Sequence, residues 1–464
     1  MPNANSTASD DDVLAPSPSS SSSFGGSKRL WALICLPLVV LATGGWFWFA
    51  SVNELQSHLD DWKSKGWPTS ADEVNDFYRV PAGVNDRTQE WVAAIEAVGA
   101  ANSHSKEKYR LIFGSDKEEI PPPGQPWDNF EAGRVLALSL DNELQLVLHA
   151  ASVPGQVRFP HNFSNGIDTL LPDTKFASES TRLLNFDARL CAHEGNYART
   201  LQDTKAIFAF SDAISGEPST LPEMLRIATY SVGVSSLEAH LPHSGWTDAE
   251  LSSLQDAVSV AHFETEMQRA MACETAIALS EIDKLPIGPL RNTNKLSIIK
   301  VMDKAIGAFS QPWPMPTKIL SESTAEINRL LSQWSANQFK DAGLRLFIPA
   351  LDDLGQSTCR AVACQRYVNL GLAAYRHQLK HGQLPASLDE LDKSLIADLP
   401  SSPDATIDPF SGRPLRFRKD ATGLLIYSVS RNLIDDGGAV VSSKTNHPPG
   451  DFGFQILIPI PANK

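Results

Sequence analysis

The chain has 464 residues, of which 42% are hydrophobic and 20% are charged, so it has enough apolar side chains for two or three folded domains. Its formal net charge of -14 argues against nucleic acid as a partner, because neutralising phosphates requires clustered Lys and Arg side chains. The sequence contains no Cys-x-x-Cys pair and no Cys/His cluster, which argues against a structural zinc site.

The N-terminal segment predicts a membrane anchor. Residues 1–29 are Ser-rich and low in complexity, so we expect a disordered cytoplasmic tail. Leu30–Ala50 carries no charge and is about as long as a membrane-spanning helix, roughly 20 residues. Lys28 and Arg29 precede it, and the positive-inside tendency places the residues after it outside the cytoplasm. The sequence therefore predicts a single-pass protein of the cell inner membrane with a periplasmic bulk. A cleaved signal peptide is the alternative, although its apolar core is usually only about 7–15 residues long.

Residues 51–357 predict a helical body. Apolar residues recur at three- and four-residue spacing from about residue 129 to residue 380, which is typical of amphipathic helices. A Glu-Gly-Asn turn at residues 194–196 separates two such helices, and Thr247 with Glu250 forms the capping-box pattern that begins another. Pairs of antiparallel helices joined by short turns are the unit of helical-repeat arrays. Since no fixed period is present, we expect a helical-repeat-like bundle rather than a regular array.

The cysteines beyond the predicted anchor are Cys191, Cys273, Cys359 and Cys364. An even number of cysteines in an oxidising compartment permits two disulfides. The alternative, which we favour for Cys191 and Cys273, is that they are small buried residues on helix faces.

Residues 358–464 predict a small α+β domain. A long helix over residues 358–379 is followed by closely spaced prolines and then by β-like runs at residues 414–418, 424–429 and 453–460. We expect these strands to form an antiparallel sheet. The predicted fold class is therefore mainly α, with one N-terminal transmembrane helix and a small α+β domain at the C-terminus.

This C-terminal segment carries several motifs in a fixed order. A helix containing Tyr375 is followed by an Asp-Pro-x-x-Gly-x-Pro stretch at residues 408–414, a strand containing Tyr-Ser at residues 427–428, and an acidic Gly-rich loop at residues 435–438. This order resembles the globular end of type II secretion major pseudopilins. The tail also looks like one found on large uncharacterised membrane-anchored bacterial proteins, where it follows a helical region much like residues 176–285. The first resemblance implies a module associated with a secretion apparatus, and the second implies no particular activity.

The pseudopilin resemblance implies a calcium site in the acidic loop. Asn432, Asp435 and Asp436 offer the amide and carboxylate oxygens that Ca²⁺ prefers, in a loop whose glycines let the backbone fold tightly. The loop departs from the family's Gly-x-Asp-Gly pattern, since residues 430–433 read Ser-Arg-Asn-Leu. The alternative is an acidic turn that closes a hairpin, with Asp side chains accepting hydrogen bonds from backbone N–H groups.

The sequence contains no complete catalytic motif and no phosphate-binding loop. We therefore predict a membrane-tethered, extracytoplasmic scaffold or binding protein with a protein partner. One alternative is a component associated with a type II secretion-like apparatus. The other is a hydrolase with a cleft between the helical body and the C-terminal domain, for which Glu274 and Asp283 would be candidate carboxylates.

Overall fold

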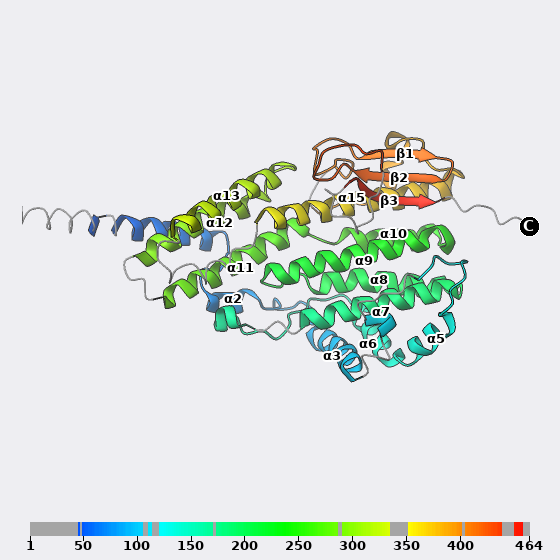
Figure 1. Cartoon of the computed structure of the whole chain (residues 1–464), viewed down its shortest axis with the longest axis horizontal. Helices are drawn as coiled ribbons and strands as arrows, with labels where there is room; N and C mark the ends of the chain where they lie inside the picture. Colours follow the sequence, from blue (N-terminus) through cyan, green and yellow to red (C-terminus); the bar gives the residue numbers. More distant parts are fainter. Residues whose placement is uncertain are drawn as a thin grey trace, which may run out of the picture. The chain divides into compact units, whose positions relative to one another are not determined.

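Helices make up most of the described chain, as its apolar periodicity predicts. The computed structural model describes residues 45–46, 49–104, 110–113, 120–169, 173–285, 290–334, 351–400, 404–438 and 450–457. Residues 49–64 are helical. The helices that follow are α2 (Ala71–Phe77), α3 (Thr88–His104), α4 (Arg110–Phe113), α5 (Phe130–Leu138), α6 (Asp141–Ser152), α7 (Asp173–His193), α8 (Tyr197–Ala213), α9 (Thr220–Ser244), α10 (Asp248–Ser259), α11 (Phe263–Lys284), α12 (Leu290–Ala308), α13 (Met315–Trp334) and α15 (Leu351–His381). Figure 1 shows their arrangement.

By their contacts, the described residues before Leu55 belong to a different unit from residues 55–464. The predicted tail and nearly all of the predicted span at Leu30–Ala50 lie outside the described residues. Within the described ranges, no helix is both long enough and apolar enough to cross a membrane. The expected membrane location therefore stays a prediction.

Short local signals end one helix and begin the next in the middle of the body. Gly195, with a φ of +74°, lies between α7 and α8, and the Asn196 side chain accepts a hydrogen bond from the Arg199 backbone N–H at 3.3 Å. Thr247 and Glu250 form the predicted capping box at the start of α10. Helices α7, α8 and α9 pack against one another (Figure 1).

Helix α15 lies at the centre of the larger hydrophobic core. It begins at Leu351 rather than at the predicted residue 358, and it is buried over most of its length because small and apolar residues occur all round it. It packs against α9, α10, α11 and α13 and against two strands of the sheet. Gly371 permits a close contact with β3, since a Cβ atom there would lie 2.4 Å from the Phe454 ring.

The predicted strands form an antiparallel sheet near the C-terminus. Its order is β1 (Arg416–Asp420), β2 (Gly423–Ser428) and β3 (Phe452–Leu457), with β2 in the centre and buried at every position. Figure 1 shows the sheet lying along α15. The described fold is thus mainly helical with a small antiparallel sheet, as expected.

The sheet and the second half of the helical region share one hydrophobic core. Ile426 and Phe454 of the sheet belong to the same cluster of buried residues as Tyr230 and Met271 of the helices. Residues 55–464 form one unit by their contacts, and the predicted division at residues 357/358 stays a prediction.

The described cysteines are buried and free. Cys191, Cys273, Cys359 and Cys364 all lie on helices, and none of them is joined to another. This agrees with the interpretation that Cys191 and Cys273 are small core residues.

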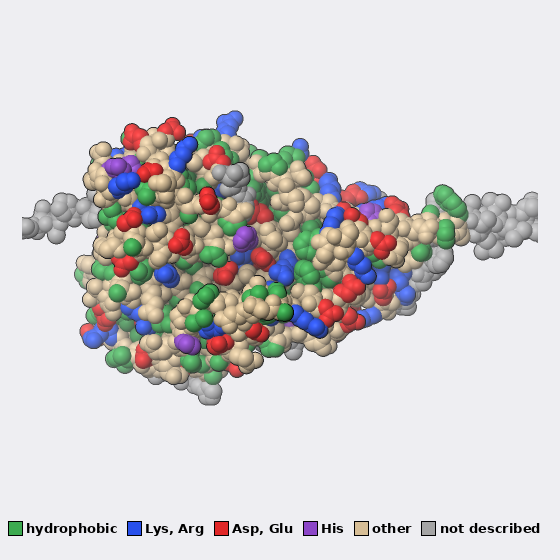
Figure 2. Space-filling view, turned by 180° about the vertical axis from the view of Figure 1, so that it is seen from behind, with side chains coloured by type: hydrophobic (Ala, Val, Ile, Leu, Met, Phe, Trp, Pro, Cys, Tyr) green, Lys and Arg blue, Asp and Glu red, His purple; other side chains and the backbone are tan. Residues whose placement is uncertain are grey.

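The surface mixes charges of both signs. Figure 2 shows acidic and basic side chains interspersed with small groups of hydrophobic ones over the face seen from behind. Large apolar side chains such as Leu138 and Leu221 are exposed at separate places in the chain. Scattered exposed apolar residues are normal on a protein surface and identify no site by themselves.

Candidate functional site

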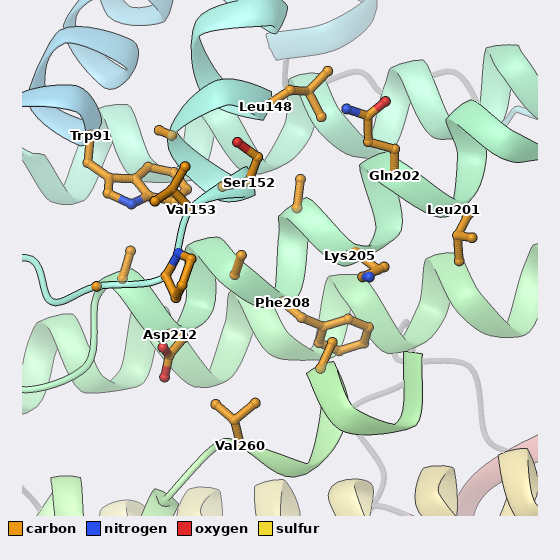
Figure 3. A pocket seen from close by; sticks show the side chains of 18 of the residues that line it. Trp91, Leu148, Ser152, Val153, Leu201, Gln202, Lys205, Phe208, Asp212 and Val260 are labelled. Atoms are coloured by element: carbon orange, nitrogen blue, oxygen red, sulfur yellow. The ribbon is translucent and has the colours of Figure 1, made fainter. Parts of the chain in front are cut away.

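An apolar groove of about 650 Å³ runs along one side of α8. Its other walls are the end of α6 with the segment that follows it (residues 150–155) and the end of α10 with Val260. Figure 3 shows Trp91 and Val153 toward one end of α8 and Leu201 toward the other. The volume falls within the roughly 300–1,000 Å³ that is typical of ligand sites.

Helix α8 presents a stripe of side chains to this groove. Leu201, Lys205, Phe208 and Asp212 line it, and their spacing of four, three and four residues places them on one helix face. Ala209 lies between them and adds little bulk. The small Ala209 side chain beside the larger Leu201 and Phe208 side chains leaves space over an apolar surface of α8.

The opposite wall depends on a glycine. Gly155 lies in the segment after α6, and a Cβ atom there would lie 2.6 Å from the Asn85 carbonyl oxygen. The two backbones can approach this closely only because residue 155 has no side chain. The Gln156 backbone N–H donates to the same Asn85 oxygen at 2.9 Å, which holds the wall in place.

Two charged side chains line the groove at different points. Lys205 Nζ donates a hydrogen bond to Ser253 Oγ at 3.2 Å. Asp212 lies two turns further along α8, about 10 Å away at the usual helical rise. Burial raises the pKa of Asp212, and the nearby Arg226 guanidinium opposes this shift. The other described residues that line the groove are neutral.

A buried pair of charges lies close enough to Asp212 to affect its pKa. Arg226 on α9 is fully buried, and its Nε and Nη2 atoms each donate to a Glu223 carboxylate oxygen at 2.7 Å. The guanidinium also lies 4.6 Å from the centre of the Phe263 ring. Burial raises the pKa of Glu223 to about 7, against the opposing effect of Arg226. Arg226 Nη1 has no hydrogen-bond partner among the described residues, so one donor of this pair is left for another acceptor.

The residues predicted to bind calcium lie in the loop after β2, where they already have protein partners. Asp435 accepts hydrogen bonds from Arg416 Nε at 2.9 Å and from the Tyr427 hydroxyl at 3.0 Å. Asn432 Nδ2 donates to an Asp436 carboxylate oxygen at 3.4 Å. These contacts are compatible with an acidic turn, the alternative to a calcium site. The calcium site stays a prediction.

A further carboxylate lies beside this loop, and no local sequence pattern pointed to it. Asp451 is buried just before β3, and one of its oxygens accepts a hydrogen bond from the Gly438 backbone N–H at 2.8 Å. Burial is the main cause of its raised pKa, and the charges of Asp435 and Asp436 add to the shift. Asp451 reaches the loop only because β3 pairs with β2, which is a long-range contact.

The carboxylates considered for a hydrolase do not converge on the groove. Glu274 accepts hydrogen bonds from Ser219 Oγ at 2.7 Å and from the Thr220 backbone N–H at 2.8 Å, so it caps the start of α9. Asp283 forms an ion pair with Lys295 at 2.5 Å. Neither of these two carboxylates lines the groove.

The groove residue Asp212 and the buried Arg226 were not predicted from the sequence. The signal that could have pointed to Asp212 is a carboxylate placed two residues after the apolar run at residues 206–210 of a helix. Arg226 similarly interrupts an apolar stretch of the next helix. Charged residues at such positions are rarely fully buried unless they are paired.

No protein-family model, curated protein or solved structure matches this chain. The resemblance of residues 375–438 to pseudopilins therefore stays a prediction.

Proposed function

We propose that this chain is a membrane-tethered binding protein that receives apolar side chains of a partner protein in the groove beside α8. The anchor predicted at residues 30–50 would hold it in the cell inner membrane, with the bulk of the chain on the extracytoplasmic side. The helical-repeat-like character predicted for the body supports this role, because such bodies offer broad surfaces to partners.

The lining of the groove is the observation that carries the proposal. Leu201, Phe208 and several alanines supply apolar surface, whereas Lys205 and Asp212 lie about 10 Å apart along α8. Acid–base hydrolysis requires catalytic groups that converge on one reacting atom. The Asp212 carboxyl group and the Lys205 amine do not converge on one point, so the groove is better suited to binding than to hydrolysis.

A partner protein suits this groove better than a lipid chain. Ser152 and Gln202 line it with exposed polar side chains, which can form hydrogen bonds with a peptide backbone. A polar rim around an apolar floor is typical of protein–protein interfaces. An acyl chain offers no hydrogen-bonding group to this rim.

Site-specific photocrosslinking in cells that express the full chain tests the proposal. A benzophenone amino acid at Val153, which lines the groove and is 40% exposed, should form a discrete crosslink to one protein. The same probe at Leu221, which is 61% exposed and does not line the groove, should not form it. Ala209→Trp should fill the groove and remove the crosslink, whereas Ala249→Trp on the exposed side of α10 should leave it.

The outcomes separate the proposal from its rivals. A crosslink to lipid at Val153 would replace the protein partner by a lipid ligand. Identical products from both probe positions, or a product that persists in Ala209→Trp, would show that the groove is not the binding site.

A second candidate function is a component of a type II secretion-like apparatus. The observation that favours it is the position of Asp451, which adds a buried carboxylate beside Asp435 and Asp436. One Asp451 oxygen, Oδ1, has no hydrogen-bond partner among the described residues. Calcium binding at this loop would strengthen the pseudopilin resemblance.

A further inference from the structure

A second hollow, of about 280 Å³, lies beside the hairpin of α7 and α8. Asp187 and Cys191, which line it, are four residues apart on α7, and Asp203 lies next to them on α8. One carboxylate oxygen of each Asp and the Cys191 Sγ atom all lie within 4.8 Å of one another. The short turn at residues 194–196 makes α7 and α8 neighbours and so brings the three side chains together.

The three side chains are buried, and the two carboxyl groups face each other. Asp203 is fully buried, and its Oδ1 atom accepts a hydrogen bond from Arg199 Nε at 3.1 Å. The Asp203 Oδ2 atom accepts no hydrogen bond from an N–H or hydroxyl donor among the described residues, and the Asp187 carboxyl group lies within hydrogen-bonding distance of the Asp203 carboxyl group. Two buried carboxyl groups that face each other need either a shared proton or a cation between them, and this arrangement points to a cation.

The charges around the cluster are unbalanced. Arg199 Nε also donates to Asp187 at 3.1 Å, so one guanidinium serves two carboxylates. Asp141 and Glu194 line the same hollow and add negative charge. Arg134 lines it as well, but its Nε atom is paired with Glu194 at 2.9 Å. A cation placed among the three buried side chains would therefore be stabilised.

We propose that Asp187, Cys191 and Asp203 bind one divalent transition-metal ion, with zinc as the best match. Zn²⁺ takes thiolate sulfur and carboxylate oxygen together, whereas Ca²⁺ and Mg²⁺ prefer oxygen ligands alone. Metal binding would release the proton of the Cys191 thiol and any proton held by the two carboxyl groups. The two carboxylates and the thiolate then carry three negative charges, which Zn²⁺ and the Arg199 guanidinium balance. The ligand atoms of a tetrahedral zinc site are about 3.5 Å apart, so small side-chain rotations would complete the coordination.

This site would keep one coordination position open. Three protein ligands and a water molecule are the pattern of catalytic zinc sites, in contrast to the Cys/His structural sites that the sequence argues against. Glu194 and Asn196 line the hollow above the cluster and could form hydrogen bonds with a metal-bound water. The site does not depend on the groove or on the function proposed for it.

Cobalt titration of the full chain, purified in detergent and stripped of metal with a chelator, tests the proposal. Thiolate ligation should give a near-ultraviolet charge-transfer band that saturates at one Co²⁺ per chain and that added Zn²⁺ abolishes. Cys191→Ser should remove the band, and Asp203→Asn should weaken Co²⁺ affinity by roughly tenfold or more. Cys273→Ser is the matched control, because Cys273 is buried on α11 outside the cluster, and it should keep the band.

A second measurement guards against folding defects in the variants. Saturating Zn²⁺ should raise the Tm of the wild-type chain and of Cys273→Ser, because a ligand that binds only the folded state stabilises it, but not the Tm of Cys191→Ser. Absence of the charge-transfer band from the wild-type chain would overturn the proposal, and so would a band that Cys191→Ser leaves unchanged.

Discussion

Replacing Arg226 by Met should destabilise the fold by about 3–5 kcal/mol at pH 8, because it leaves the buried Glu223 carboxylate without its partner. Arg226 is fully buried, Glu223 is 2% exposed, and two charge-assisted hydrogen bonds of 2.7 Å join them. Methionine has a long apolar side chain that keeps part of the contact with Phe263, so the loss is mainly electrostatic.

The destabilisation should become smaller as the pH falls. Burial raises the folded-state pKa of Glu223 to about 7, above its usual value of about 4.3. The Arg226 charge lowers this pKa, so removing Arg226 should raise the pKa further. A carboxyl group with a raised folded-state pKa contributes fully to stability below its unfolded pKa, and this contribution is lost as the pH rises through the folded pKa. Arg226→Met should therefore lie closer to the wild type at pH 5 than at pH 8.

Urea unfolding of the full chain in detergent, followed by helical circular dichroism at both pH values, measures this effect. Arg79→Met is the matched control, because Arg79 pairs with Asp76 on the surface and such pairs contribute little. The double variant Glu223→Leu/Arg226→Met should recover most of the lost stability, since it leaves no buried charge of the pair. A loss under about 1 kcal/mol at pH 8, or an equal loss at both pH values, would refute the reasoning.

Further predictions concern packing, capping and metal binding. Gly371→Ala should lower the free energy of unfolding by about 1–3 kcal/mol, because the new Cβ atom would lie 2.4 Å from the Phe454 ring. Gly307→Ala, on α12 with open space around it, should raise the free energy of unfolding by up to about 1 kcal/mol. Urea unfolding measures both variants. Thr247→Ala should lower the free energy of unfolding by about 1 kcal/mol, because it removes the capping box. Thr247→Ser should keep most of the stability that the cap contributes, in the same assay. Calorimetric titration of the full chain with CaCl₂ should show heat that Asp435→Ala/Asp436→Ala abolishes if the loop binds calcium, and no heat if it is only an acidic turn.

The helices and strands were predictable where their signals are local. The turn at residues 194–196 and the capping box at Thr247 act within a few residues of the helix ends that they define. The strands likewise follow from short β-like runs, and their antiparallel pairing follows from the connection between the first two of them. The start of α15 was missed, because its first two turns, from Leu351, precede the run of small and apolar residues that begins near residue 358.

The groove and the buried charges were not predictable, because they depend on contacts between distant segments. Gly155 approaches Asn85 across 70 positions of the chain, and its role appears only when the two backbones are in place. Arg226 and Glu223 form a local pair, yet its burial depends on α8 and on Phe263 of α11. Sequence patterns thus predict which segments are helices, but they do not predict which charged residues those helices enclose.

The two proposed sites use different faces of α8, and this makes them separable by experiment. Asp203 and Lys205 are two residues apart, so at about 100° per residue their side chains point in nearly opposite directions, one toward α7 and the other into the groove. Ala209→Trp should therefore remove the crosslink at Val153 and leave the cobalt band unchanged. Asp203→Asn should weaken cobalt binding and leave the crosslink. If each variant lost both signals, a shift of α8 as a whole would explain the losses, and neither site would be supported by its own variant.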